Sequence, residues 1–297
     1  MPRGGDGQHA GMDDRSDRVG VVVVTRDRRR TTLDSLGRLL ETDPGVPVTV
    51  VDNASSDGTA EAVSERYPEV TVVRLPANLG AAGRNSGMAL TPCPYIAFSD
   101  DDSWWAPGAL SRAADLFDAH PNLGVVAGQI LVGPQERVDP VCDVMASSPL
   151  GSGRGPGVGV LGFVACGAVV RREAFLGVGG FRLGYGIGGE EELLAIDLRA
   201  AGWDLRYCAG VVAHHHPATD RPPGADRRRR QTRNAMRTAW LRRPVSSVLR
   251  STAAYARPAW ADPAVRRGLA DGLRDAAWVW RERLPVDRVL EQDLRRL

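Results

Sequence analysis

The sequence contains no lysine, and all 38 of its basic residues are arginine. They are nearly balanced by 36 acidic residues, so the formal net charge of +2 argues neither for nor against a nucleic-acid partner. Cysteine is scarce as well, and no C-x-x-C pair occurs among the four, Cys93, Cys142, Cys166 and Cys208. This spacing disfavours a zinc site or a disulfide framework and is typical of small buried thiols in a reduced compartment.

Long apolar segments are also missing. The longest run, residues 158–170, has 13 residues interrupted by three glycines, which is too short to cross a membrane. The first 18 residues are polar and contain no apolar core of the kind found in signal peptides, so we expect a disordered cytoplasmic tail. Neither G-x-G-x-x-G nor G-x-x-x-x-G-K-[ST] follows the first apolar run, which disfavours dinucleotide-binding Rossmann enzymes and P-loop NTPases.

Strand and helix patterns alternate from residue 19 onwards. Apolar, β-branched runs at residues 19–25, 46–51, 70–73 and 95–98 predict strands, and leucines at helical spacing follow the first of them. This alternation predicts an α/β fold with a mostly parallel central sheet covered by helices on both faces. We assign residues 19–225 to this α/β domain and residues 226–297 to a C-terminal helical region.

Three adjacent carboxylates, Asp100, Asp101 and Asp102, follow the strand predicted at residues 95–98. Open α/β sheets bind ligands beyond the carboxyl ends of their strands. Three neighbouring carboxylates raise one another's pKa values unless a cation is present, and oxygen ligands of this kind suit Mg²⁺ or Mn²⁺. The alternative is an acidic cluster near the start of the helix that Pro107 begins, where negative charge is favourable.

Glycine is concentrated in residues 151–162, where six of twelve positions are glycine. Such a backbone has little to fix its conformation, so the segment is either a linker or a loop that becomes ordered over bound substrate. The pattern favours a mobile active-site loop.

The order of several short motifs resembles that of the family 2 glycosyltransferases, which have the GT-A fold. The motifs that carry the resemblance are 22–25 (VVVT), 51–59 (VDNASSDGT), 78–80 (NLG), 83–87 (GRNSG), 100–102 (DDD), 179–181 (GGF), 189–191 (GEE), 201–203 (AGW) and 211–214 (VVAH). The resemblance covers residues 19–243 and implies an inverting, metal-dependent enzyme that moves a sugar from a nucleotide-diphosphate donor to an acceptor hydroxyl.

The resemblance also implies roles for individual residues. Thr25 and Asp52 would line the nucleotide pocket, and Arg84 would contact the base or the diphosphate. Asp100 would contact the ribose, the metal or both, and Asp101 would belong to the donor site with no role assigned to it. Asp102 would bind the metal. The alternatives are a turn cap for Asp52, because Asp-Asn before Ser-Ser-Asp-Gly is good turn chemistry, and an ordinary surface arginine for Arg84.

Three consecutive histidines follow the last predicted strand, which covers residues 210–213. Their side chains alternate, so His214 and His216 share one face and His215 takes the other. The position that matches the metal-binding histidine of the family is His214, with His216 as the second candidate. A nitrogen ligand beside carboxylates suits Mn²⁺ somewhat better than Mg²⁺.

The acidic pair before the last catalytic-domain helix is Glu190-Glu191, and its second member, Glu191, would be the catalytic base. The alternative is that glutamates in a first helical turn merely complement the helix dipole. The sequence departs from the family at Leu193, where relatives usually carry a further carboxylate.

The region after residue 216 is rich in arginine and tryptophan. Residues 227–230 are four consecutive arginines that could form a solvated face, bind nucleic acid or, with Arg233-Asn234, cover the donor diphosphate. Trp260, Trp278, Trp280 and Leu284 are expected to pack against the catalytic domain. They could instead join two copies as a homodimer, and contact with a membrane surface is not expected.

The sequence therefore predicts a cytoplasmic glycosyltransferase whose partners are a nucleotide-sugar donor and a small-molecule or glycan acceptor, with no nucleic acid. A nucleotidyltransferase also needs a carboxylate–metal site at a sheet edge, but it has no use for a base at Glu191. An arginine-rich nucleic-acid-binding protein is the third possibility, although its basic segment lacks aromatic residues on which bases could stack.

Overall fold

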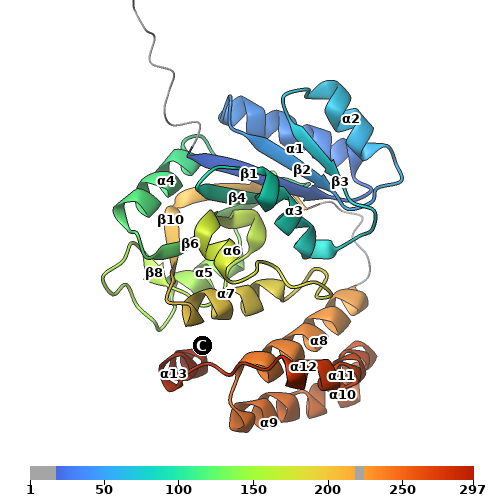
Figure 1. Ribbon diagram of the computed structural model, residues 1–297, viewed down its shortest axis with the longest axis vertical. Coiled ribbons are helices and arrows are strands. Elements are labelled where there is room, and N and C mark those ends of the chain that lie inside the picture. The colour runs from blue at the N-terminus through green and yellow to red at the C-terminus, as the bar shows by residue number, and fades with distance from the viewer. Residues whose placement is uncertain (1–17, 218–223) are drawn as a thin grey trace, which may run out of the picture.

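A computed structural model describes residues 18–217 and 224–297 of the protein (Figure 1). The tail predicted for residues 1–18 lies outside the described residues except for Arg18, as do residues 218–223. Central to the fold is one mixed sheet. Its strands are β1 (Val19–Thr25), β2 (Val48–Asp52), β3 (Thr71–Arg74), β4 (Tyr95–Asp100), β5 (Ser103–Trp105), β6 (Leu123–Val132), β7 (Arg137–Val138), β8 (Val158–Gly159), β9 (Ala168–Arg171) and β10 (Asp204–His215).

The strand order is β3-β2-β1-β4-β9-β6-β10-β5, with β7 beside β6 and β8 beside β10. Pairing is parallel from β3 to β4 and between β6 and β10. β9 runs antiparallel between β4 and β6, and β5 runs antiparallel to β10. The predicted α/β class is confirmed, with a parallel half followed by a mixed half.

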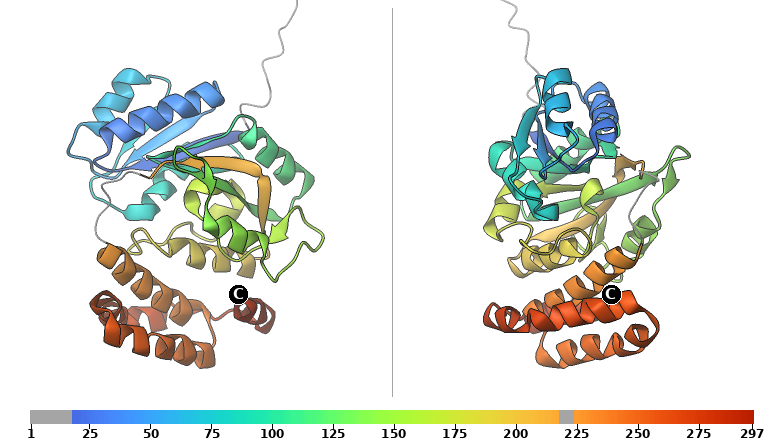
Figure 2. Two further views of the ribbon diagram at one scale, coloured as in Figure 1. Left: turned by 180° about the vertical axis from the view of Figure 1, so that it is seen from behind. Right: turned by 90° about the vertical axis from the view of Figure 1, so that its right-hand side faces the viewer.

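Helices cover both faces of the sheet (Figures 1 and 2). One face packs against α1 (Arg29–Thr42), α2 (Thr59–Arg66) and α4 (Ala109–Ala119). The other packs against α3 (Gly83–Leu90), α5 (Pro140–Ala146), α6 (Arg172–Gly177) and α7 (Glu190–Ala200).

The first strand shows why the sheet is central. Every residue of β1 is buried, because Val21 and Val23 face the α1 side while Val22 faces α3. A strand covered on both faces reads as a continuous apolar run, which is the pattern in the sequence.

The C-terminal helices form a separate layer beneath α7 (Figure 2). They are α8 (Gly224–Arg242), α9 (Val245–Ala254), α10 (Ala256–Ala261), α11 (Pro263–Arg274), α12 (Ala276–Arg281) and α13 (Arg288–Arg296). Tyr185 and Leu193 of the sheet-containing part pack with Met236 and Trp240 of α8. Leu193, where a carboxylate was expected, is thus an apolar contact between the two parts. None of the described helices is long and apolar enough to span a membrane.

The glycine-rich segment does not cover the carboxylates. Val158 pairs with Tyr207, and Arg206 donates through Nη1 to the carbonyl of Ser152 at 2.5 Å. A Cβ at Gly157 would lie 2.0 Å from the carbonyl oxygen of Tyr207, so glycine is needed for this close approach. Residues 151–159 therefore lie against the first half of β10, whereas His214 and His215 lie at its other end. The prediction of an active-site loop was wrong for residues 151–159.

Candidate active site

Asp100 ends β4, and its carboxylate forms an ion pair with Arg84 of α3. Arg84 can reach it because α3 approaches β1 closely: a Cβ at Gly87 would lie 2.5 Å from Cγ1 of Val22. The Arg84 side chain is 3% exposed, and its guanidinium lies 5.6 Å from the ring centre of Phe181. Its Nε and Nη1 atoms have no hydrogen-bond partner within the described residues. Arg84 is therefore a buried cation, and the surface-arginine interpretation was wrong.

The next two carboxylates diverge. Oδ2 of Asp101 accepts a hydrogen bond of 3.4 Å from Oγ1 of Thr25, at the end of β1. Burial, together with the charges of Asp102 and Asp100, raises the pKa of Asp101 to about 7. Asp102 is buried, and its Oδ1 lies 3.1 Å from Nε2 of His215. The three acids thus face different partners within one turn.

The alternation of the histidines is as predicted, but the histidine that reaches the carboxylates is His215 and not His214. The ring of His214 stacks on Trp104 with 5.2 Å between ring centres, and its Nδ1 lies 3.0 Å from Oε1 of Glu136. His216 also contacts Trp104. The physical reason is strand register, since His214 pairs with Trp104 and His215 with Ser103, which places them on opposite faces of the sheet.

Candidate metal ligands lie on the face of the sheet to which His215 belongs. A carboxylate oxygen of Asp100, the Sγ of Cys166 and a ring nitrogen of His215 all lie within 4.8 Å of one another. Burial raises the pKa of the Cys166 thiol well above its ordinary value, and a sulfur ligand suits Mn²⁺ and Mg²⁺ less well than oxygen or nitrogen. Carboxylate oxygens and an imidazole nitrogen remain, and this donor set fits Mn²⁺ or Mg²⁺.

At the end of β2, Asp52 acts as a turn cap. Its Oδ1 accepts a hydrogen bond of 2.9 Å from the backbone amide of Ser55. Asp52 pairs in register with Thr25 on β1, and both side chains are buried. The two residues expected in the nucleotide pocket therefore lie next to each other at the sheet edge that carries Asp100.

The acidic pair begins α7, whose N-cap Gly189 has a φ of 85°. Glu190 is buried, and its carboxylate accepts a hydrogen bond from the amide of Gly188. Burial and the neighbouring Glu191 raise its pKa to about 8. Burial also raises the pKa of Glu191, while the Arg84 guanidinium and the Ala165 amide oppose that change. The Ala165 amide bonds to the Glu191 carboxylate, and the sulfur of the next residue, Cys166, lies within 4.8 Å of an Asp100 oxygen and a His215 nitrogen. The Glu191 carboxylate therefore lies near the carboxylate edge.

A buried asparagine of α8 holds the segment before α7, a role that no sequence pattern indicated. Asn234 is fully buried and donates through Nδ2 to the carbonyls of Tyr185 (3.0 Å) and Gly188 (2.8 Å). The carbonyl of Gly186 in turn accepts from the amide of Ala81 at 3.1 Å. The only sequence signal was the glycine-rich run at 184–189, which needs external anchors because it has little stiffness of its own.

The arginine run at the start of α8 is largely engaged within the protein. Arg228 pairs with Asp262 at 2.8 Å, and Arg229 pairs with Asp271 at 2.6 Å. Arg230 donates to the carbonyl of Ile187 at 3.3 Å. These contacts join α8 to α11 and to the glycine-rich run at 184–189, and they supply no argument for a nucleic-acid surface.

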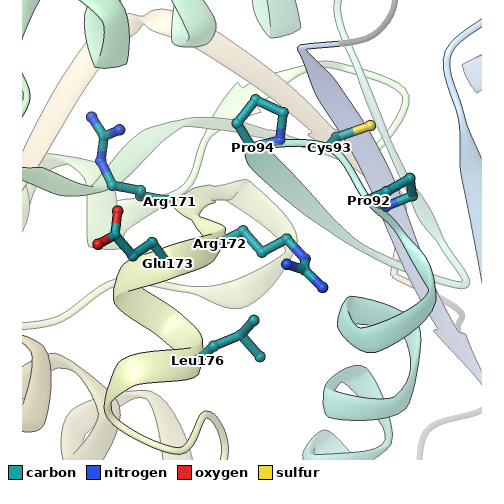
Figure 3. A pocket seen from close by; sticks show the side chains of 7 residues that line it. All are labelled: Pro92, Cys93, Pro94, Arg171, Arg172, Glu173 and Leu176. Carbon is teal, nitrogen blue, oxygen red and sulfur yellow. The ribbon is translucent and has the colours of Figure 1, made fainter.

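A shallow pocket lies at the opposite edge of the sheet (Figure 3). Pro94 precedes β4, whose other end carries Asp100, and Arg171 ends the neighbouring antiparallel β9. The Arg171 guanidinium is directed at backbone carbonyls, including Leu123 at 2.9 Å and Phe117 at 2.9 Å. This pocket is separate from the candidate site.

The fold is that of GT-A glycosyltransferases. The chain resembles a mannosyltransferase from Pyrobaculum calidifontis, solved with GDP-Man and Mn²⁺, with a TM-score of 0.59 and 20% identity over 88% of this chain and 87% of that one. It also resembles TarS 1–349 of S. aureus in complex with UDP-GlcNAc, with a TM-score of 0.57 and 14% identity over 94% and 91% of the two chains.

The sequence identifies the family. The profile of Glycosyl transferase family 2 matches residues 20–177, more than half of the chain. One relative is the N-acetylglucosaminyl-diphospho-decaprenol L-rhamnosyltransferase of Mycobacterium tuberculosis, 28% identical over 222 residues, which cover 63% of this chain and 72% of the relative. The chain belongs to glycosyltransferase family 2 and is a glycosyl-transferring enzyme. This membership confirms the resemblance and disfavours the nucleotidyltransferase alternative.

Proposed function

We propose that the protein is an inverting, metal-dependent glycosyltransferase that moves a sugar from a nucleotide-diphosphate donor to an acceptor hydroxyl. The observation that carries the proposal is the nearness of Glu191 to the Asp100–Asp102 edge: the Ala165 amide bonds to Glu191, and the adjacent Cys166 lies within 4.8 Å of Asp100 and His215 ligand atoms. A base close to a diphosphate site is what a single displacement at the anomeric carbon requires.

The donor would bind at the carboxyl ends of β1, β2 and β4. Thr25, Asp52 and Asp101 supply polar contacts for the nucleoside. Arg84 is well suited to the diphosphate, because two of its buried nitrogens lack partners within the described residues and its charge is held in an apolar cage of Phe98 and Phe181. A guanidinium in such surroundings stabilises a developing phosphate charge more strongly than it would in water.

Asp100, Asp102 and His215 are the residues proposed to hold the divalent metal. When bound, the metal would supply positive charge for the departing nucleoside diphosphate. The mannosyltransferase from Pyrobaculum calidifontis, solved with Mn²⁺, supports this assignment by analogy of fold. Arg84 and the metal ligands together would keep the leaving group in line with the attacked carbon.

Glu191 is proposed as the general base. It would accept the proton of the acceptor hydroxyl as that oxygen forms a bond to the anomeric carbon, while the bond from this carbon to the diphosphate oxygen breaks on the opposite side. The electron pair leaves with the nucleoside diphosphate, and the configuration inverts. The raised pKa of Glu191 brings its basicity closer to neutral pH, which favours proton transfer.

For the acceptor we propose a saccharide carried on a lipid diphosphate. The support is the mycobacterial relative, whose name specifies transfer of L-rhamnose to N-acetylglucosaminyl-diphospho-decaprenol. Nucleotide-activated rhamnose is therefore the first donor to test, followed by the GDP- and UDP-linked sugars seen in structural neighbours.

The test is a thermal-shift screen of nucleotide sugars with Mn²⁺ and with excess chelator, followed by NMR of the product of the best donor. We expect stabilisation only when the metal is present, and a product whose anomeric configuration is opposite to that of the donor. Equal stabilisation in chelator would contradict metal dependence, and retention of configuration would contradict the inverting mechanism.

A further inference from the structure

The helices α9 and α10 belong to the layer farthest from the sheet (Figures 1 and 2). They expose several apolar side chains. Trp260 of α10 is 90% exposed, and Leu249 and Val245 of α9 are 66% and 53% exposed. Trp278, by contrast, packs against the core formed by α8 and Tyr185. Trp280 and Leu284 are 48% and 70% exposed, so of the four residues expected to pack inwards Trp278 does and Trp260 does not. Solvation of a whole indole is unfavourable, so exposed apolar residues that gather on one face usually mark a contact surface.

These residues share one side of an almost continuous helix. Only Tyr255 separates α9 from α10, and its φ of −82° and ψ of −11° are helical. At about 100° per residue, positions 245, 249, 253, 256 and 260 fall within an arc of about 80°. We call this set the α9–α10 stripe: Val245, Leu249, Ala253, Ala256 and Trp260. The buried residues Val248 and Ala259 lie on the inner side of the same helices.

The C-terminal helical region that carries the stripe is positively charged. Residues 224–297 contain 18 arginines and 8 acidic residues, a net charge of +10, whereas the rest of the chain carries −8. Arg250 and Arg257 are exposed beside the stripe, on the same edge of the helical arc. Neither forms an ion pair with any residue that the structure describes, unlike Arg228 and Arg229. The charge at the edge of the stripe is therefore available to an external partner.

We propose that the α9–α10 stripe docks the protein on the surface of a membrane that contains anionic lipids. A helix with an apolar stripe and flanking arginines lies in the headgroup region with its apolar side chains turned inwards, and tryptophan favours that interface. Each basic residue near an anionic surface contributes about fivefold in partitioning, which corresponds to about 1 kcal/mol. The aliphatic side chains of Val245 and Leu249 favour lipid over nucleic acid, which would be contacted by arginine and aromatic groups alone.

The test is co-sedimentation of the full-length protein with vesicles, without donor, acceptor or metal. Vesicles of neutral phosphatidylcholine are compared with vesicles that contain about one third phosphatidylglycerol. We expect binding to the anionic vesicles that weakens with added salt. Trp260→Ala should weaken it by about tenfold or more, because a large apolar side chain no longer enters the interface. The double variant Arg250→Gln/Arg257→Gln should weaken it by about 25-fold.

The matched control is Leu90→Ala, which removes an exposed apolar side chain (57% exposed) from α3 in the sheet-containing part. It should bind vesicles like the parent, and all variants should keep the parental melting temperature because the altered side chains are solvated. Failure to bind anionic vesicles, or equal weakening by Leu90→Ala, would overturn the proposal. The proposal would also be overturned if the protein did not bind vesicles but formed a dimer that Trp260→Ala disrupts. Binding of nucleic acid in place of vesicles would overturn it as well. The assay involves no sugar transfer, so its failure leaves the proposed reaction untouched.

Discussion

The Nε2 atom of His215 lies 3.1 Å from Oδ1 of Asp102. A backbone contact fixes this pair, since the amide of His216 donates to the carbonyl of Asp102 at 2.8 Å. The antiparallel pairing of β5 with β10 therefore decides which of three consecutive histidines faces the carboxylates. A shift of one residue in register would exchange His215 for His214 and break the arrangement.

This relationship predicts different outcomes for neighbouring histidine variants. His215→Ala should reduce Mn²⁺ affinity by at least about 100-fold, because it would remove a metal ligand rather than a residue that merely orients one. The measurement is the gain in melting temperature produced by Mn²⁺ with a nucleoside diphosphate, each variant being compared with its own ligand-free state. His214→Ala is the control and should keep the gain, although loss of the Trp104 stack lowers its starting stability. If His214→Ala abolished the gain and His215→Ala kept it, our assignment would be reversed.

A second prediction concerns Asn234. Asn234→Ala leaves the carbonyls of Tyr185 and Gly188 without their buried donor, and the segment before α7 should loosen. Misplacement of a base by about 1 Å costs on the order of 100-fold, so kcat should fall by about 10- to 100-fold. Hydrogen exchange should accelerate at residues 184–189.

Ser246→Ala, at an exposed position of the neighbouring α9, is the control for Asn234→Ala. It should leave both kcat and exchange unchanged. Normal exchange at residues 184–189 in Asn234→Ala would show that other contacts, such as those of Arg233 with Tyr185 at 2.6 Å, are sufficient to hold the segment.

The third prediction is a pH dependence of stability that arises away from the site. Asp43 follows α1, and its Oδ2 is buried without a hydrogen-bond partner among the described residues. Burial raises the pKa of this carboxyl from 3.8 to about 6. The folded state thus holds the proton more tightly, and stability falls as the pH rises from about 4 to about 6.

Asp43→Asn removes that penalty. We expect the variant to be more stable than the parent by about 1 kcal/mol at pH 8, once solvent screening of a partly exposed group is allowed for, and equal to it near pH 4. Urea denaturation at the two pH values measures the difference. A constant difference at both values would mean that the effect of the substitution is not electrostatic.

Local patterns predicted the elements that lie within single segments. β1 is a run of buried valines, α7 begins at the glutamates after Gly189, and Gly202 with a φ of 91° follows its end, as local chemistry requires. The carboxylate edge was also predictable, because Asp100 ends a strand in a parallel half-sheet.

Features that depend on pairing between distant segments could not be predicted. The histidine facing Asp102 follows from the register of β5 on β10, which no local pattern encodes. The glycine-rich residues 151–159 looked like a mobile loop because the close approach of Gly157 to Tyr207 is visible only after folding. The burial of Arg84 could not be predicted, because its partner Asp100 is 16 residues away.

The final prediction tests the proposed base. Glu191→Gln keeps the size and helix propensity of the side chain but removes the proton acceptor. Loss of a general base typically lowers the rate by about 10²–10⁴-fold, so kcat should fall by that amount while donor affinity and melting temperature stay close to the parent. Transfer measured at saturating donor and acceptor gives kcat, and the thermal shift with donor and Mn²⁺ reports binding.

Glu190→Gln is the matched comparison, because the two acids are adjacent yet differently engaged. The Glu190 carboxylate accepts from the Gly188 amide inside the protein, and its pKa is raised to about 8, so much of it is already protonated at neutral pH. An amide in its place keeps an acceptor oxygen for Gly188, and we expect a loss of less than about tenfold. A Glu191→Gln enzyme at full rate beside an inactive Glu190→Gln enzyme would move the base to Glu190. If Glu190 were the base, its carboxylate would have to lose its proton before each turnover. The rate of the parent enzyme should then rise with pH up to about 8.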